Sequence, residues 1–439
     1  MSKVGAAILV LSAVAYLWTP SYKTPLFGLT PGAILGGLAV YLTLLQVLAR
    51  SKLTFIPEFR RLLAVSIGLL TWAALVYSFS GAYPAAFRRI LQIILGISVS
   101  WSVYTFVRSS KRIKIFIFVL LAAGSVSALV GIGQFYVGGP FIDLWATLVR
   151  PPEGRLSLAR VLVPGLAPMS ILLGYQLATL LPLAVALLFS RSMFISRILK
   201  GLVVLVSITM VFALVLSGSR SAIGSAFFGV AFVVLLLRRR GSRWGPRLVI
   251  SLTFCILLYV LVGVFYQSAR FLLLVEDISV AVRPSLALTA LRYAFFHPFG
   301  TGVYRPSKEE YVILGPDPRV EAVVGALTPH NQFFNVLVYY GFPGLVMLVV
   351  FYWLLFRTLR KCWLATVQNH DAYKWMVGGL IGAFLAYLVN SMFHNAGPFV
   401  GDWFHWFFIG LAFSVHRLVL SSSPSSYDCS LLGLHHNRS

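Results

Sequence analysis

Residues 201–237 read GLVVLVSITMVFALVLSGSRSAIGSAFFGVAFVVLLL, and this stretch decides what kind of fold the chain can have. It consists of two apolar runs, 201–217 and 221–237, separated by a break that contains Arg220. Runs of this length and polarity are typical of helices that cross a bilayer. Because the break is so short, we expect the two helices to form a tight hairpin in the membrane.

The same apolar character extends over the whole chain. Of its 439 residues, 59% are hydrophobic and 11% are charged, whereas soluble domains average about 25% charged residues. A soluble enzyme is therefore excluded, because a globule of this composition could not cover its surface. We predict an all-α polytopic membrane protein, with residues 1–420 forming one transmembrane domain and residues 421–439 a disordered cytoplasmic tail. The twelve expected spans are 4–18, 27–49, 61–79, 90–107, 113–137, 171–190, 201–217, 221–237, 248–267, 332–356, 375–393 and 401–418.

The net charge of +24 comes from 36 lysines and arginines against 12 acidic residues. In a soluble protein this excess would suggest a nucleic-acid partner, but in a membrane protein the positive-inside rule accounts for it. With the N-terminus inside, the larger share of the basic residues falls in short inner segments, which predicts that both termini are cytoplasmic. Two long segments, 138–170 and 268–331, then lie outside, and loops of such length usually carry function. No nucleic-acid partner is expected.

Three arginines near predicted outer span ends could bind an anionic ligand. Arg220 lies in the hairpin Ser217-Gly218-Ser219-Arg220-Ser221, where a cation is costly unless it is paired or faces a cavity. The alternative is that its side chain only snorkels to the interface. Arg88 and Arg89 open the fourth predicted span, where a helix N-terminus would also favour anions. Their alternative role is that of an interfacial anchor pair.

A histidine stands directly before the tenth predicted span. His330 lies in the sequence Pro329-His330-Asn331-Gln332. Histidine is a natural general base near neutral pH because its ordinary pKa is about 6.5. A solvated residue at the start of a helix is the alternative.

Two further arginines lie nine residues apart in the longest outer segment. Arg283 and Arg292 cannot share one face of an ideal helix. We expect one of them to face a cavity and the other to form an ion pair, with Glu276 or Asp277 as the available acids.

Other polar residues near the outer ends of the last two spans could line the same cavity. These are His394, Asn395 and Asp402. The outer acids do not have the spacing of a metal site, and the sequence contains no phosphate-binding Walker motif. We therefore expect no metal and no cofactor.

Several of these pieces occur in an order that resembles the O-antigen ligase and polymerase superfamily. The resemblance covers roughly residues 120–356. The segments that carry it are 131–135 (GIGQF), 175–178 (YQLA), 216–222 (LSGSRSA), 283–302 (RPSLALTALRYAFFHPFGTG), 330–334 (HNQFF) and 340–345 (YGFPGL).

The resemblance implies a GT-C-like glycosyltransferase in the inner membrane of a Gram-negative bacterium, with its active site on the periplasmic face. An O-antigen ligase transfers the O-antigen from undecaprenyl pyrophosphate to a hydroxyl of the lipid A core. In that role Arg220, Arg88 or Arg89, and Arg283 with Arg292 would bind the pyrophosphate, and His330 would be the base of an inverting, metal-independent reaction. The donor, the acceptor and membrane lipids are the implied partners.

Two alternatives stay open within this family, and one outside it. An O-antigen polymerase would extend chains from single repeats, and a protein O-oligosaccharyltransferase would modify Ser or Thr side chains. A twelve-span transporter is the alternative from a different class. It is disfavoured because the two halves of the chain show no obvious repeat and no matching Pro- or Gly-interrupted helices.

Overall fold

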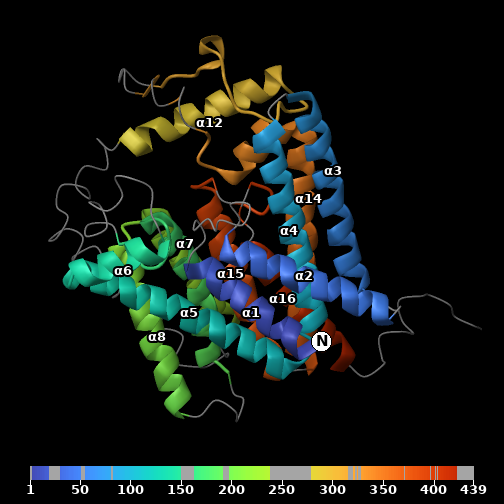
Figure 1. Ribbon diagram of the computed structural model, residues 1–439, viewed down its shortest axis with the longest axis vertical. Coiled ribbons are helices and arrows are strands. Elements are labelled where there is room, and N and C mark those ends of the chain that lie inside the picture. The colour runs from blue at the N-terminus through green and yellow to red at the C-terminus, as the bar shows by residue number, and fades with distance from the viewer. Residues whose placement is uncertain are drawn as a thin grey trace, which may run out of the picture.

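The fold of the described chain is helical throughout (Figure 1). The computed structural model describes residues 2–18, 30–50, 55–80, 83–149, 163–190, 197–237, 278–314, 320–321, 324, 328–369, 371–395, 397–400, 402 and 404–422. Its helices are α1 (Ser2–Trp18), α2 (Pro31–Arg50), α3 (Pro57–Ser80), α4 (Tyr83–Phe106), α5 (Ser110–Tyr136), α6 (Gly139–Val149), α7 (Ser170–Leu188), α8 (Arg197–Leu216), α9 (Arg220–Leu237), α12 (Ile278–Phe296), the short 3-10 helix η2 (Lys308–Glu310), α14 (Gln332–Asn369), α15 (Asp371–Ser391) and α16 (Phe404–Ser422).

Many of these helices can cross a membrane, as the sequence predicts. Within the described residues, eight are long and apolar enough to do so, namely α3, α4, α5, α7, α8, α9, α14 and α16. The helices α1 and α2 are apolar but shorter. The predicted span 248–267 and the predicted tail beyond Ser422 lie outside the described residues, so the total of twelve spans stays a prediction. The prediction of an all-α polytopic membrane protein is confirmed.

Small residues let α9 and α15 approach each other closely in the centre of the bundle. A side-chain carbon added to Gly229 of α9 would lie 2.6 Å from the carbonyl oxygen of Gly382 on α15. Pro182 of α7 packs against the same two glycines. Contacts of this kind are typical of membrane helices, where close backbone approach replaces the hydrophobic effect as the main attraction. The middle of α15 is therefore packed closely against α7 and α9.

The helix α12 lies across one end of the bundle, where it packs against α14 (Figure 1). It ends at Phe296, two residues before Pro298. The following loop docks onto a break in α14. At Gly341 the backbone leaves the helical conformation, with φ 68° and ψ −168°.

The loop after α12 satisfies the backbone groups that this break leaves open. The N–H of Phe342 donates to the carbonyl of Pro298 at 2.8 Å, and the N–H of Gly302 donates to the carbonyl of Tyr339 at 2.9 Å. From α3, the indole N–H of Trp72 donates to the carbonyl of Tyr340 at 2.7 Å. The break in α14 and the loop thus form one hydrogen-bonded unit, which fixes the C-terminal end of α12.

A short helix that the sequence did not predict, α6, covers part of the segment 138–170. Its Trp145 donates its indole N–H to the carbonyl of Ala167 at 2.8 Å. Gln134 of α5 bonds both the N–H and the carbonyl of Gly165, each at 2.9 Å. The motif 131–135 therefore has a structural role here, because it pins this segment onto α5.

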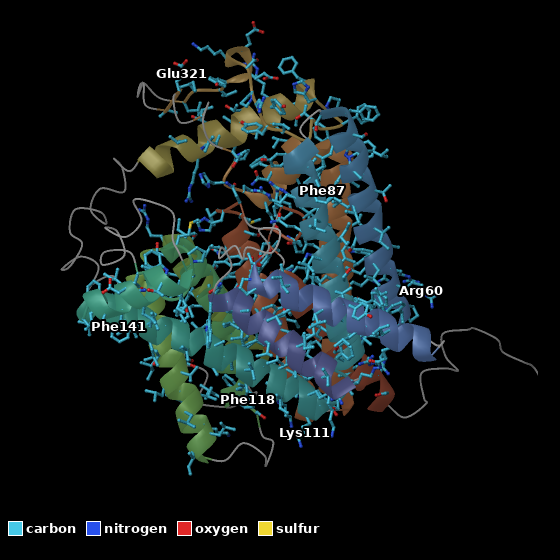
Figure 2. The ribbon with its side chains drawn as sticks, in the orientation of Figure 1. Arg60, Phe87, Lys111, Phe118, Phe141 and Glu321 are labelled. Atoms are coloured by element: carbon cyan, nitrogen blue, oxygen red, sulfur yellow. The ribbon has the colours of Figure 1, made fainter. Side chains whose placement is uncertain are left out.

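Three charged residues mark two different ends of the bundle (Figure 2). Arg60, near the start of α3, and Lys111, near the start of α5, lie away from α12 (Figure 2). Glu321, from the predicted outer segment, lies at the end where α12 crosses the bundle (Figure 2). The placement of these ends relative to the two sides of a membrane stays a prediction.

Candidate functional site

The predicted hairpin around Arg220 is a three-residue turn between α8 and α9. Gly218 has a φ of 66°, in the left-handed region that favours glycine. The hydroxyl of Ser217 donates to the carbonyl of Leu214 at 2.7 Å, and the first backbone bond of α9 runs from Ile223 to Ser219 at 3.1 Å. Arg220 is the first residue of α9 and is half-buried. Its guanidinium thus stands where the unsatisfied N–H groups of a helix start also lie.

The hairpin rests directly on α7. A side-chain carbon at Gly174 would lie 3.0 Å from the hydroxyl oxygen of Ser217 and 3.0 Å from the Cβ of Ser219. This contact sets how far the turn can sink into the bundle. It also explains a glycine in this part of α7, because a larger residue would lift the turn that carries Arg220.

His394 connects this hairpin to the rest of the site. The hydroxyl of Ser221, the residue after Arg220, lies 2.6 Å from Nε2 of His394. His394 belongs to the short segment that follows α15. Its burial, together with the nearby charges of Arg283 and His330, lowers its pKa to about 4. His394 is therefore neutral at physiological pH, and it lies close to both of these predicted site residues.

Arg283 and His330 come together from different elements. The Arg283 guanidinium lies over the ring of Phe393, 5.5 Å from its centroid. Half-buried His330 has a pKa below its ordinary value of 6.5, first because of its burial and second because of the Arg283 charge. Asn331 caps α14 by accepting the N–H of Phe333 at 2.8 Å. His330 is thus the last residue before a capped helix start.

The structure distinguishes the two arginines of α12. Arg283 is half-buried and faces the two histidines, whereas Arg292 is exposed. The roles expected for the two arginines stay predictions. Glu276 and Asp277, the acids considered as ion-pair partners, lie outside the described residues.

The arginine pair on α4 lies elsewhere than its predicted position at a helix N-terminus. The helix begins at Tyr83, so Arg88 and Arg89 lie in its second turn, beyond the N–H groups that a helix start leaves open. Hydropathy placed the boundary at residue 90 because it detects the charged pair rather than the end of the helix. Arg88 is exposed, and half-buried Arg89 lies over the ring of Tyr339, 5.1 Å from its centroid.

The sequence grouped Asp402 with residues that could line the cavity. In the structure its side chain is instead buried and accepts several hydrogen bonds. Its carboxylate accepts the hydroxyl protons of Tyr16 at 2.8 Å, of Tyr387 at 2.9 Å and of Tyr175. It also accepts the N–H of Phe404 at 3.0 Å. These donors belong to α1, α15, α7 and α16, so Asp402 joins four helices.

Sequence reasoning undervalued His394 and Asn395. The signal that could have raised them is a repeated His-Asn pair, since both His330-Asn331 and His394-Asn395 stand at predicted outer span ends. Both pairs reach the same region of the structure. In the part of the chain that the structure describes, no three His, Cys, Asp or Glu side chains gather as metal ligands would. The cations identified at the site are arginines.

A cavity of about 540 Å³ opens near this end of the bundle, between α3 and the loop that follows α12. Its lining does not include the predicted site residues, so it is a separate feature. The lining residues are Val76, Phe79, Ser80, Gly300, Thr301, Val303 and Arg305.

Comparison with known proteins agrees with the motifs. A family model described as O-antigen ligase matches residues 205–349, which include Arg220, Arg283 and His330. A search of curated proteins found no match. The matched segment contains four of the six sequence segments that carry the resemblance, namely 216–222, 283–302, 330–334 and 340–345. Residues 205–349 of this chain are therefore similar to the O-antigen ligase family.

Proposed function

We propose that this protein is an O-antigen ligase that transfers O-antigen polysaccharide from undecaprenyl pyrophosphate to a hydroxyl of the lipid A core. The observation that carries the proposal is the meeting of Arg283, His330 and the Arg220 hairpin around His394. These groups come from four separate parts of the chain. Two arginines near this pair of histidines would supply the positive charge and the proton acceptor that transfer from a diphosphate requires.

In this proposal His330 is the general base. Its lowered pKa keeps the imidazole neutral, and so able to accept a proton, at pH values below its ordinary 6.5. The acceptor hydroxyl oxygen forms a bond to the anomeric carbon of the donor and gives its proton to His330. The bond from the anomeric carbon to the phosphate oxygen breaks, and undecaprenyl pyrophosphate leaves. Attack from the face opposite to the leaving group inverts the anomeric configuration.

Arg220 and Arg283 bind the pyrophosphate. A guanidinium is planar and donates two parallel hydrogen bonds to phosphate oxygens, which a lysine cannot match. Arg220 starts α9, where backbone N–H groups and the helix dipole add to the attraction for an anion. The arginines offset the charge that develops on the leaving oxygen, so the proposed reaction is metal-independent.

The proposal retains Arg88, Arg89 and Arg292 as donor contacts. Their positions favour contacts away from His330, because Arg89 lies against Tyr339 and Arg292 is exposed. Alanine substitution at each position tests these contacts. A raised apparent KM for the donor assigns the contact, and an unchanged KM removes it.

Complementation of a strain that lacks the gene tests the function. Wild-type protein should restore the lipopolysaccharide ladder on a gel, while His330→Ala should leave intact core and accumulated lipid-linked glycan. Arg220→Lys should also fail to restore the ladder, because the lysine ammonium cannot make the two parallel hydrogen bonds of the guanidinium. Arg60→Lys should restore the ladder. Arg60 is the matched control because it is exposed near the far end of α3 (Figure 2). A full ladder with well-expressed His330→Ala would overturn the assignment of the base.

The same strains separate the alternatives. A polymerase should lengthen chains from single repeats without any core acceptor, and a protein O-oligosaccharyltransferase should label a protein band. A transporter should form no new covalent bond in detergent. Purified protein that transfers preassembled glycan onto lipid A core, but does not polymerise single repeats, supports the ligase.

A further inference from the structure

We propose that the three consecutive residues Phe393-His394-Asn395 are positioning residues, each holding a different element of the site in place. This inference rests on the proposed function, because it explains how the site is assembled. None of the three lies in the segment matched to the family model, which ends at residue 349. The three contacts are separate, and each is carried by its own observation.

His394 holds the start of α9. Its Nε2 lies 2.6 Å from the hydroxyl of Ser221, so a hydrogen bond ties the loop after α15 to the residue that follows Arg220. The ring is largely buried and neutral at physiological pH, so the bond does not depend on a charge. Because α9 begins at Arg220, fixing Ser221 fixes the direction in which the Arg220 side chain leaves the backbone.

Phe393 holds Arg283. The guanidinium of Arg283 lies over the phenyl ring, 5.5 Å from its centroid, which is within the range of a cation–π contact. A ring can support a guanidinium without occupying the hydrogen-bond donors at its edge. The contact with Phe393 therefore fixes the guanidinium of Arg283 from its planar face.

Asn395 holds the segment that carries His330, and it does so on both sides. Its Nδ2 donates to the hydroxyl of Thr328 at 2.8 Å, two residues before His330. Its Oδ1 accepts from Nδ2 of Asn335 at 2.8 Å, and the same Nδ2 lies 2.7 Å from the carbonyl of Pro329. The backbone segment that carries His330 is thus held by hydrogen bonds on both sides of this residue, at Thr328 and Pro329 before it and at Asn335 after it.

The support for these three contacts is rigid. The N–H of Phe393 donates to the carbonyl of Asn390 at 3.0 Å, so the segment continues the hydrogen bonding of α15. The helix α15 is itself packed against α9 through Gly229 and Gly382. One short segment on a central helix therefore sets the spacing between the two phosphate-binding arginines and the base.

The test combines substitution, binding and kinetics on the full chain purified in detergent. The variants are His394→Phe, which keeps a ring and removes the bond, and His394→Gln, which keeps a side-chain hydrogen-bonding group. The probe for binding is inorganic pyrophosphate, titrated by calorimetry, and transfer is followed with lipid-linked glycan. His297→Phe is the matched control, because His297 is partly exposed and pairs with Glu310 outside the site.

Positioning predicts a particular pattern. His394→Phe should weaken pyrophosphate binding about tenfold and lower kcat about a hundredfold, while His394→Gln should recover to within about threefold of wild type. Ser221→Ala combined with His394→Phe should lose no more than the worse single variant, because both remove the same bond. Phe393→Leu should mainly weaken pyrophosphate binding, and Asn395→Leu should mainly lower kcat. Wild-type values in His394→Phe, or strictly additive losses in the double variant, would overturn the proposal.

Failure of the proposed function gives a different result. In that case wild-type protein neither binds pyrophosphate nor transfers glycan. Amide hydrogen exchange then tests whether His394 and Asn395 hold their segments in place. His394→Phe should then raise amide exchange in peptides over residues 219–223, and Asn395→Leu in peptides over residues 328–335. Unchanged exchange in both regions refutes positioning, whatever reaction the protein catalyses.

Discussion

Replacing Gly341 with alanine tests the hydrogen-bonded unit between the break in α14 and the loop after α12. The backbone at this position has φ 68° and ψ −168°, a conformation that essentially only glycine adopts. An added Cβ would also overlap the backbone of Pro298, Phe299 and Gly300. Since these are backbone atoms, no side-chain rotation can relieve the overlap.

The size of the effect follows from two contributions. The backbone conformation costs an alanine on the order of 1–3 kcal/mol. The overlap of the added Cβ with backbone atoms of the docked loop costs about a further 1–3 kcal/mol. A total of about 2–6 kcal/mol corresponds to roughly a thirtyfold to twenty-thousandfold change in the equilibrium between docked and released loop.

Hydrogen exchange with mass spectrometry measures this change directly. In Gly341→Ala, amides in peptides covering residues 298–302 and 341–343 should exchange at least about thirtyfold faster than in wild type. Gly201→Ala is the matched control, because Gly201 lies in helix α8 with nothing within 4 Å of an added Cβ. That variant should keep wild-type exchange in both peptides. Wild-type protection of residues 298–302 in Gly341→Ala would show that the loop does not depend on the break.

Three further predictions concern the site and its support. Arg283→Ala should raise the pKa of His330, because the Arg283 charge lowers it in the wild type. The acid limb of the pH–rate profile should then move to higher pH. An acid limb at the wild-type position would contradict the electrostatic link. Gly174→Ala should push the hairpin outward at a cost of about 1–3 kcal/mol. Both the melting temperature and the transfer activity should fall. A melting temperature at or above that of wild type would contradict the close packing of the hairpin on α7. Asp402→Asn should leave at least one tyrosine hydroxyl poorly paired and cost about 1–3 kcal/mol, measured by thermal melting. Because Tyr16 donates to Asp402, the double variant with Tyr16→Phe should lose less than the sum of the two single losses, and a strictly additive loss would contradict the contact.

Hydropathy predicted where lipid-facing helix exists, but not where helices begin and end. Span 332–356 ends at the first charge, Arg357, whereas α14 continues to Asn369. The extension is held by Lys361, which bonds Glu58 at 3.0 Å near the start of α3. The early start of α4 has the same origin, because a hydrogen-bond ladder continues past the point where a helix meets polar surroundings. The helix α6 was not predicted because it is too short to span and its burial depends on tertiary contacts.

The candidate site was partly predictable for a related reason. Arg220, Arg283 and His330 stand out because charge and histidine are conspicuous at the ends of apolar runs. Their convergence was not predictable, since it depends on the crossing of α12 over the bundle and on the path of the segment after α15. His394 was undervalued because its importance lies in its contact with Ser221, and no local pattern encodes a contact across 173 residues.

The carboxylate of Asp402 has a consequence for how the protein is made. Tyr16 on the first helix finds its hydrogen-bond acceptor 386 residues later in the chain. All residues from Tyr16 to Asp402 must therefore be synthesised before this hydrogen bond can form. The hydroxyls of Tyr175 on α7 and Tyr387 on α15 donate to the same carboxylate, so their bonds also require Asp402 to have been made. A nascent chain that stops before Asp402 therefore lacks the acceptor that these three helices share.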